Sequence, residues 1–119
     1  MQRILENELM DTPAEALAYD QMDHAEVNAR FVDDLLAAAG PLSAPTRVAD
    51  LGTGTAQIPI ELCRRVPEVL VVGIDAAESM LAVGRQNLAQ AGIADRVELV
   101  CRDAKQVPHD LGHFDIVMS

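Results

Sequence analysis

The stretch RVADLGTGTA, residues 47–56, decides how the chain is organised. Its apolar run at residues 48–51 is typical of a β-strand, and Gly52 and Gly54 then turn the chain into a helical pattern that begins near Ala56. Glycine lets a backbone approach a ligand closely and adopts turn dihedrals that other residues avoid. The stretch therefore suits a nucleotide-like ligand, and a tight strand-to-helix turn without a ligand is the alternative interpretation.

From Arg47 onward, short apolar runs alternate with helical patterns. The runs cover residues 48–51, 70–74, 97–101 and 114–118, and the helical patterns cover residues 57–65 and 78–91, the second closed by Gly92. The third connection, residues 102–113, contains a proline and a glycine and is too short and broken for a full helix. Runs that are apolar on both faces indicate parallel strands covered on both sides, so the sequence predicts an α/β fold.

The first 45 residues have the pattern of a helical cap. Apolar residues at positions 4, 5, 9 and 10 predict a short amphipathic helix. Residues 12–15, Thr-Pro-Ala-Glu, then have the form of a capping box with proline at the first helical position, and a long helix follows. Its apolar stripe contains Val27, Phe31, Val32, Leu35 and Leu36. A glycine and a proline at positions 40 and 41 end it, so we divide the chain into residues 1–45 and 46–119.

The charge and composition of the chain limit the kinds of partner that it can bind. Nine basic and 19 acidic residues give a formal charge of −10, which disfavours nucleic acids and anionic membranes because both would be repelled. The sequence has no apolar stretch long enough to span a membrane and no signal-peptide pattern, so we expect a cytoplasmic protein. Cys63 and Cys101 lack the spacing of metal ligands, and we expect two reduced, buried thiols and no metal site. Small molecules remain as partners.

Acidic residues lie at or just beyond the carboxyl end of three of the four runs. Doubly wound sheets bind ligands beyond the carboxyl ends of their strands, where Asp50, Asp75 and Asp103 are expected. Asp75 follows Gly52 by 23 positions, close to the roughly 20-residue interval at which an acid accepts from ribose hydroxyls. The alternative role for Asp75 is to cap the helix at residues 78–91.

The spacing of the glycines distinguishes between the classes of nucleotide cofactor that the chain could bind. A dinucleotide fingerprint, GxGxxG, needs glycine at position 57, which is Gln57, and the chain has no GxxxxGK[ST] motif. Asp50 would disfavour a pyrophosphate nearby and would favour a ligand with positive charge. A nicotinamide-dependent oxidoreductase is therefore the weaker hypothesis.

These residues resemble the class I S-adenosylmethionine-dependent methyltransferases. VADLGTGTA at residues 48–56 is similar to their first motif, VGID at 72–75 with ESML at 78–81 to the second, VCRDA at 100–104 to the third, and FDIVMS at 114–119 to the start of the fourth. The resemblance implies a Rossmann-like three-layer sandwich with a parallel sheet in the order 3-2-1-4, preceded by the amino-terminal helices. It also implies S-adenosylmethionine as methyl donor and a small-molecule acceptor.

The resemblance implies a role for each residue that occupies a cofactor-binding position of the family's motifs. Asp50 would lie beside the methionine end of the cofactor, Gly52 and Gly54 would offer their backbone, and Asp75 would bind the ribose. Asp103 would bind the adenine amino group, with Ala76, Met80 and Ala104 flanking the ring. Two positions depart from the family pattern: Ala56 replaces the third glycine, and Ala77 stands where many members have a helix-capping serine. No catalytic residue is identified. Tyr19 could close over the methyl group, and a partly buried packing role is the alternative.

Family members continue with a helix and three further strands after the point corresponding to Ser119. We therefore expect an incomplete sheet whose fourth strand is an apolar edge that invites self-association. The sequence leaves two readings of this chain open: a methyltransferase, and a non-catalytic half-domain that binds the cofactor or a partner chain.

Overall fold

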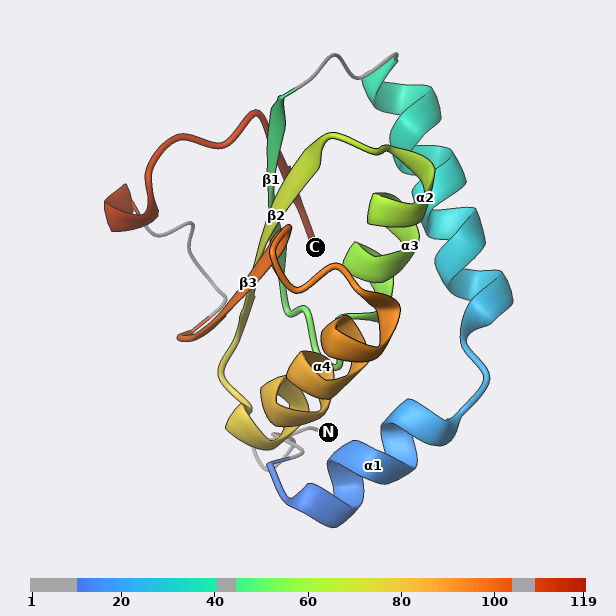
Figure 1. The fold of residues 1–119 in the computed structure, drawn as a ribbon, viewed down its shortest axis with the longest axis vertical. Helices are drawn as coiled ribbons and strands as arrows, with labels where there is room; N and C mark the ends of the chain where they lie inside the picture. The colour runs from blue at the N-terminus through green and yellow to red at the C-terminus, as the bar shows by residue number, and fades with distance from the viewer. Residues whose placement is uncertain (1–10, 41–44, 104–108) are drawn as a thin grey trace, which may run out of the picture.

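The computed structural model describes residues 11–40, 45–103 and 109–119. Its centre is a four-stranded parallel sheet in the order β3-β2-β1-β4 (Figure 1). The strands are β1 (Thr46–Leu51), β2 (Val69–Asp75), β3 (Val97–Cys101) and β4 (Ile116–Met118). This arrangement confirms the predicted α/β fold and strand order.

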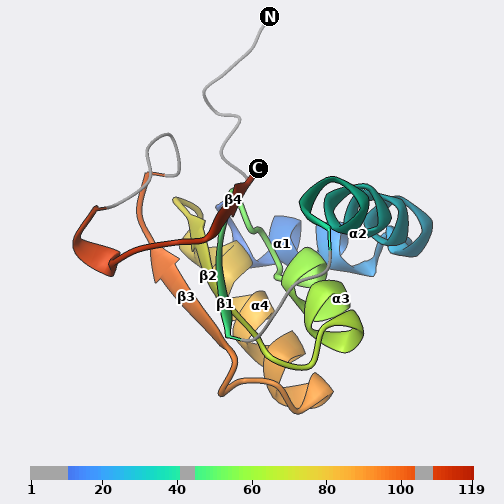
Figure 2. The same cartoon turned by 90° about the horizontal axis from the view of Figure 1, so that it is seen from above.

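Four helices lie on one side of this sheet. α3 (Gln57–Arg65) connects β1 to β2, and α4 (Glu78–Ala91) connects β2 to β3. α1 (Pro13–Gln21) and α2 (Ala25–Ala39) pack outside them, α1 against α4 and α2 against α3 (Figure 2). In the described part of the chain, no helix combines the length and apolarity needed to cross a membrane.

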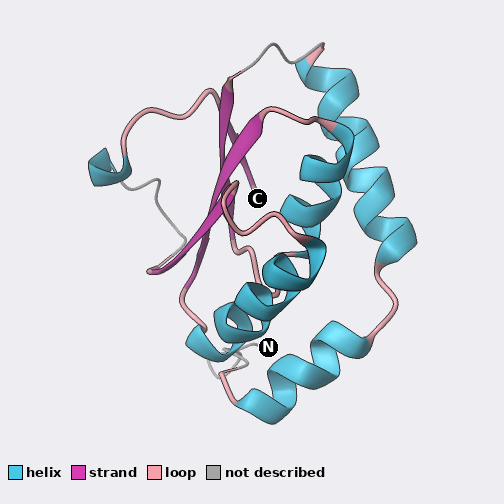
Figure 3. Ribbon diagram, in the orientation of Figure 1, coloured by secondary structure: helices cyan, strands magenta, loops and turns pink. Residues whose placement is uncertain are grey.

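The other side of the sheet carries little helical structure. The short 3₁₀ helix η2 (His109–Leu111) is the helical element found there among the described residues (Figure 3). Leu70 and Val117, which alternate with core residues along β2 and β4, are 44% and 45% exposed. The expectation that the apolar runs are covered on both sides therefore does not hold at these two positions.

The amino-terminal region departs from the predicted single long helix. The chain breaks at Met22, which has an extended backbone, and restarts where the Asp23 carboxylate accepts from the Ala25 amide at 3.1 Å. The predicted cap of α1 is confirmed, since the Thr12 hydroxyl accepts from the Glu15 amide at 3.2 Å. The helix predicted near residues 4–10 lies outside the described residues.

The hydrophobic core lies between the sheet and the helices. Val48 and Val71 from the sheet, Leu62 from α3 and Leu88 from α4 are almost fully buried there. From α2, Val32 is fully buried and Phe31 packs against the same cluster. Burying a side chain of this size contributes about 1.5–3 kcal/mol. Val27, placed in the stripe by its spacing, is 69% exposed, so the prediction was wrong for that residue. The prediction of buried thiols was also wrong for Cys101, which is exposed, whereas Cys63 is buried as expected.

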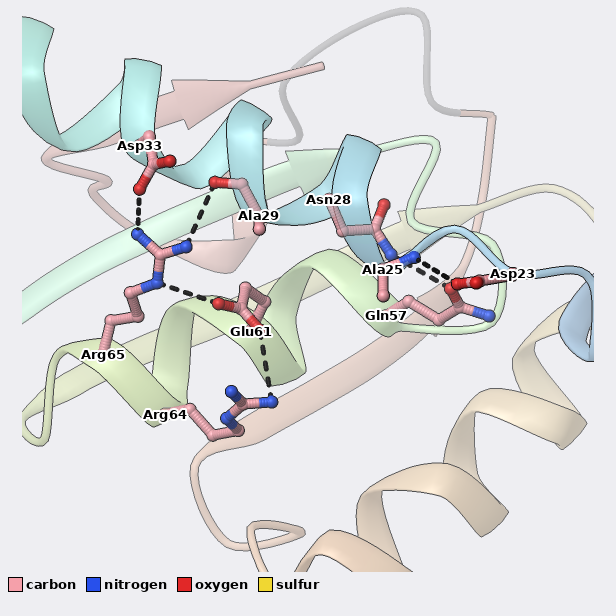
Figure 4. Close-up of polar contacts among 9 residues, drawn as sticks. All are labelled: Asp23, Ala25, Asn28, Ala29, Asp33, Gln57, Glu61, Arg64 and Arg65. Atoms are coloured by element: carbon pink, nitrogen blue, oxygen red, sulfur yellow. Dashed lines mark hydrogen bonds and ion pairs between the residues drawn. The ribbon is translucent and has the colours of Figure 1, made fainter.

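Polar contacts hold α2 against α3. The Arg65 guanidinium donates to Glu61 one turn earlier on α3 at 2.8 Å, and across the interface to Asp33 and to the Ala29 carbonyl (Figure 4). Asn28 donates to the Gln57 side chain at 3.0 Å at the other end of the same interface. α2 is thus tied to the first and last residues of α3, and its position is set relative to the β1–α3 turn.

Candidate functional site

The chain leaves β1 through a turn at residues 52–56, which we call the glycine turn. Gly52 and Gly54 have φ angles of +79° and +59°, values that favour glycine. The amides of Gly52 and Thr53 both donate to the Ile74 carbonyl, at 2.7 and 3.0 Å. These bonds fasten the turn to the end of β2.

Ala56 ends the turn in the left-handed conformation, with φ of 69°. It is the non-glycine residue with positive φ in the described part of the chain, and such a conformation costs an alanine about 1–2 kcal/mol. Its side chain is fully buried, and a Cβ atom added to Gly84 would lie 3.3 Å from the Ala56 Cβ. Ala56 therefore fills space between the turn and α4 while the backbone keeps the geometry of a third glycine.

The Asp75 carboxylate joins the glycine turn to the start of α4. Its Oδ2 accepts from the Gly54 amide and its Oδ1 from the Ala77 amide, each at 2.9 Å. A carboxylate has about four acceptor positions, so two remain for hydroxyl groups of a ligand. The amides of Gly52 and Gly54 already have partners within the protein. At Gly52 nothing lies within 4 Å of the position that a Cβ atom would occupy, whereas at Gly54 that position is 3.2 Å from the Met80 Cε atom.

The helix-capping role considered for Asp75 belongs to another residue. The residue before α4 is Ala77, whose side chain makes no cap. The Asp11 carboxylate instead accepts from the Ser79 amide at 2.9 Å, across 68 positions of sequence. Ser79 is the second residue of α4, where a capping side chain is normally bound. The family serine missing at position 77 is thus replaced by an acid from the amino-terminal segment.

Asp50 lies buried beside Asp75 and has an unusual protonation equilibrium. Its side chain is 5% exposed, and its pKa is raised from 3.8 to about 6, chiefly by burial. The neighbouring Thr53 side chain partly offsets the rise, although its hydroxyl makes no hydrogen bond of good geometry, and the negative Asp75 adds to it. A cationic group placed here would stabilise the ionised carboxylate.

These groups face a cavity of about 220 Å³ at the carboxyl ends of β1 and β2, which we call the turn cavity. Five of the eight predicted cofactor residues line it: Asp50, Gly52, Gly54, Asp75 and Met80. The volume is below the roughly 300–1,000 Å³ of most small-molecule sites, so the described residues enclose only part of a ligand of that size. Their roles as cofactor contacts stay predictions.

The other three predicted residues do not line the turn cavity. Ala76 is exposed and directly follows Asp75. Asp103 is exposed two positions after the end of β3, at the same edge of the sheet. Ala104 lies outside the described residues.

The amino-terminal helices supply a wall of the turn cavity that sequence reasoning missed in part. Tyr19 comes from α1, and Asn28 and Phe31 come from α2. The stripe on α2 suggested that Phe31 belongs to the core, and it does pack there, but it also faces the cavity. The sequence marked Tyr19 as a candidate and gave no signal for Asn28.

A family profile described as a methyltransferase domain matches residues 48–119, more than half of the chain. The chain belongs to the class I S-adenosylmethionine-dependent methyltransferases. The match begins in β1 and takes in the glycine turn, Asp75 and the other strand ends. The family resemblance of the sequence is thereby confirmed.

Curated relatives of this methyltransferase domain include quinone-pathway enzymes. The ubiquinone/menaquinone biosynthesis C-methyltransferase UbiE of Ectopseudomonas oleovorans is 41% identical over 75 residues, covering 62% of this chain and 44% of the relative. The demethylmenaquinone methyltransferase of Porphyromonas gingivalis is 33% identical over 75 residues, covering 62% of this chain and 31% of the relative. The chain thus spans less than half the length of these relatives.

Solved structures agree on the fold. A Methanococcus maripaludis protein described as an S-adenosylmethionine-dependent methyltransferase gives a TM-score of 0.73 at 18% identity, covering 89% of this chain and 48% of that one. An RNA methyltransferase of Salinibacter ruber, solved with S-adenosylhomocysteine, gives 0.63 at 28% identity, covering 74% and 55% of the two chains.

Proposed function

We propose that this methyltransferase domain binds S-adenosylmethionine in the turn cavity and presents its methyl group to a small-molecule acceptor. The observation that carries the proposal is the pairing of two carboxylates, Asp50 and Asp75, beside a glycine turn. Burying Asp50 beside a second acid is costly unless a positive charge offsets it. S-adenosylmethionine has an ammonium and a sulfonium group as well as ribose hydroxyls, so it matches both acids.

Each end of the cofactor has residues that suit it. Asp50 accepts from the ammonium group of the methionine end, and the open Cα surface of Gly52 admits its close approach. The free acceptor positions of Asp75 take the ribose hydroxyls. In the proposal Met80, Ala76 and Ala104 contact the adenine ring, and Asp103 accepts from its amino group.

The chemistry that S-adenosylmethionine supplies when bound is a methyl group on an already activated sulfonium leaving group. The residues of this chain bind and orient the donor and keep water from the reacting atoms, because in-line transfer depends mainly on alignment. Phe31 and Tyr19 add apolar surface to the turn cavity, which supports the exclusion of water. We assign no general base.

The second part of the proposal concerns the identity of the methyl acceptor. A net charge of −10 favours a small molecule over a nucleic acid. Because relatives are named for ubiquinone and menaquinone biosynthesis and for demethylmenaquinone, a reduced demethylated quinone is the first acceptor to try.

We further propose that residues 46–119 form the cofactor-binding unit and residues 1–45 a helical cap, in a cytoplasmic protein.

A methyl-transfer assay tests this function. The chain is incubated with S-adenosylmethionine carrying a labelled methyl group and a reduced demethylated quinone, and label in the quinone is measured. Transfer that Asp75→Ala reduces strongly supports the proposal. Cofactor binding without transfer favours the non-catalytic half-domain, and light scattering then tests self-association through β4. Saturable NADH binding without any affinity for S-adenosylhomocysteine would favour an oxidoreductase.

A further inference from the structure

Helix α1 lies alongside α4 in the same direction, from its first turn to its last. Ala16 is fully buried against Ala77, Met80 and Val83, and Tyr19 packs against the same cluster. Figure 1 shows α1 beside α4. An alanine at the contact point lets the two helices approach closely.

A carboxylate holds α1 at each end. Before its first turn, Asp11 accepts from the Ser79 amide of α4 at 2.9 Å. In its last turn, Asp20 Oδ1 accepts from the side-chain amides of Gln57 at 2.9 Å and Asn87 at 2.8 Å. Hydrogen bonds to charged groups are about twice as strong as those between neutral groups.

The two residues that donate to Asp20 also contact the glycine turn or directly follow it. Asn87 also donates to the Thr55 carbonyl at 3.0 Å, and Gln57 is the first residue of α3, directly after the turn. The Gln57 side chain also accepts from Asn28 of α2 at 3.0 Å (Figure 4). One carboxylate therefore links the end of α1 to α2, α3, α4 and the turn.

Tyr19 lies directly before Asp20 and forms part of the wall of the turn cavity. Its ring stacks on the His24 ring with centroids 4.7 Å apart, and His24 Nε2 lies 3.1 Å from the Tyr19 carbonyl. The ring is thus in contact with the residue that precedes α2.

We propose that Asp11 and Asp20 are positioning residues that hold α1 on α4 and thereby keep Tyr19 in the wall of the cofactor cavity. The proposal rests on the proposed function for the identity of the ligand. A local serine at position 77 would cap α4 without involving α1. The cap supplied by Asp11 instead makes the order of the adenine side of the cavity depend on the docking of the amino-terminal segment.

Tyr19 provides its own readout, because the chain contains one tyrosine and no tryptophan. In ligand-free protein, quenching of the tyrosine emission by acrylamide, a neutral quencher, measures how accessible Tyr19 is. We expect stronger quenching in Asp11→Ala and in Asp20→Ala than in the wild type. Unchanged quenching in both variants overturns the proposal, whether or not the protein binds the cofactor.

Binding of S-adenosylhomocysteine, measured by calorimetry, gives the second readout. We expect Asp11→Ala and Asp20→Ala each to lower the affinity about tenfold, which corresponds to about 1.4 kcal/mol. Asp20→Asn should lose less affinity than Asp20→Ala, because the amide oxygen of asparagine can still accept both bonds although the charge is gone. Glu26→Ala removes an acid whose side chain is 90% exposed and is the matched control for charge.

The double variant Asp11→Ala with Ala77→Ser separates positioning from helix stability. The new serine can cap α4 locally, so we expect the thermal stability to recover while the affinity and the quenching stay altered. Recovery of the affinity together with the stability would show that Asp11 acts only as a cap and would contradict the proposal. If wild-type protein fails to bind S-adenosylhomocysteine, the proposed function fails, and the quenching experiment still decides the placement of Tyr19.

Discussion

The Gly54 amide donates to Oδ2 of Asp75 at 2.9 Å, joining the turn after β1 to the end of β2 across 21 positions of sequence. The same carboxylate accepts from Ala77 through its other oxygen. Asp75, which the family resemblance assigns to ribose binding, therefore also holds the glycine turn next to the start of α4. Loss of binding and loss of stability should accompany each other when Asp75 is changed.

Replacing Asp75 by asparagine should affect both properties. An asparagine offers one acceptor oxygen, so at least one of the Gly54 and Ala77 amides would face a donor. We expect a loss of about 1–3 kcal/mol in the free energy of unfolding, measured by urea denaturation, and weaker binding of S-adenosylhomocysteine. Wild-type stability of Asp75→Asn would show that the two amide contacts contribute little.

Asp50→Asn should stabilise the ligand-free protein at neutral pH. Folding raises the Asp50 pKa from 3.8 to about 6, so the folded state keeps a proton that the unfolded state releases. The favourable contribution is present below about pH 4 and is lost as the pH rises to about 6, which amounts to roughly 2–3 kcal/mol. Denaturation at pH 8 should therefore show a gain of about 1–3 kcal/mol for the variant, and the gain should disappear near pH 4. A variant less stable than wild type at pH 8 would contradict the burial argument.

Cofactor affinity should depend on pH through the same carboxylate. A cationic ligand prefers ionised Asp50, so affinity should fall below about pH 6, by about tenfold at pH 5 relative to pH 7.5. Calorimetric titrations with S-adenosylhomocysteine across this range measure the effect. Asp50→Asn is the control and should bind weakly with a flat profile. A flat profile in the wild type would place the ligand cation away from Asp50.

Gly73→Ala should disturb the glycine turn from the neighbouring strand. Gly73 pairs with Asp50 in the sheet, and a Cβ atom added there would lie 2.7 Å from the Thr53 hydroxyl and 2.8 Å from a Leu99 methyl. We expect a destabilisation of about 1–3 kcal/mol and weaker binding, since Thr53 must move. The additional change Thr53→Ala removes the first clash and should restore part of the stability. No restoration would assign the damage to Leu99 alone.

Local patterns predicted much of this fold because the relevant forces act over short distances. The bounds of α3, α4 and β3 follow from apolar periodicity together with punctuation such as Gly92, and the structure confirms them. The single long helix expected between residues 13 and 40 was wrong, because the chain breaks at Met22 and a new helix begins after the Asp23 carboxylate accepts from the Ala25 amide.

The parts of the site that could not be predicted depend on contacts between distant residues. No local rule pairs Asp11 with Ser79 or Asp20 with Asn87, since each pair is more than 60 positions apart. The spacing of Phe31 on its helix places it in the core but does not show that its ring also reaches the turn cavity. These features come from the docking of α1 and α2 on the sheet unit, which a one-dimensional pattern does not encode.

Calorimetric titration of the wild-type chain with S-adenosylhomocysteine, in parallel with Asp75→Ala and the surface control Glu26→Ala, tests the central claim most directly. The proposed function predicts saturable binding to the wild type with one ligand per chain, unchanged binding to Glu26→Ala and strongly weakened binding to Asp75→Ala. Heats indistinguishable from ligand dilution, obtained with a wild-type sample shown to be folded by circular dichroism, would contradict it.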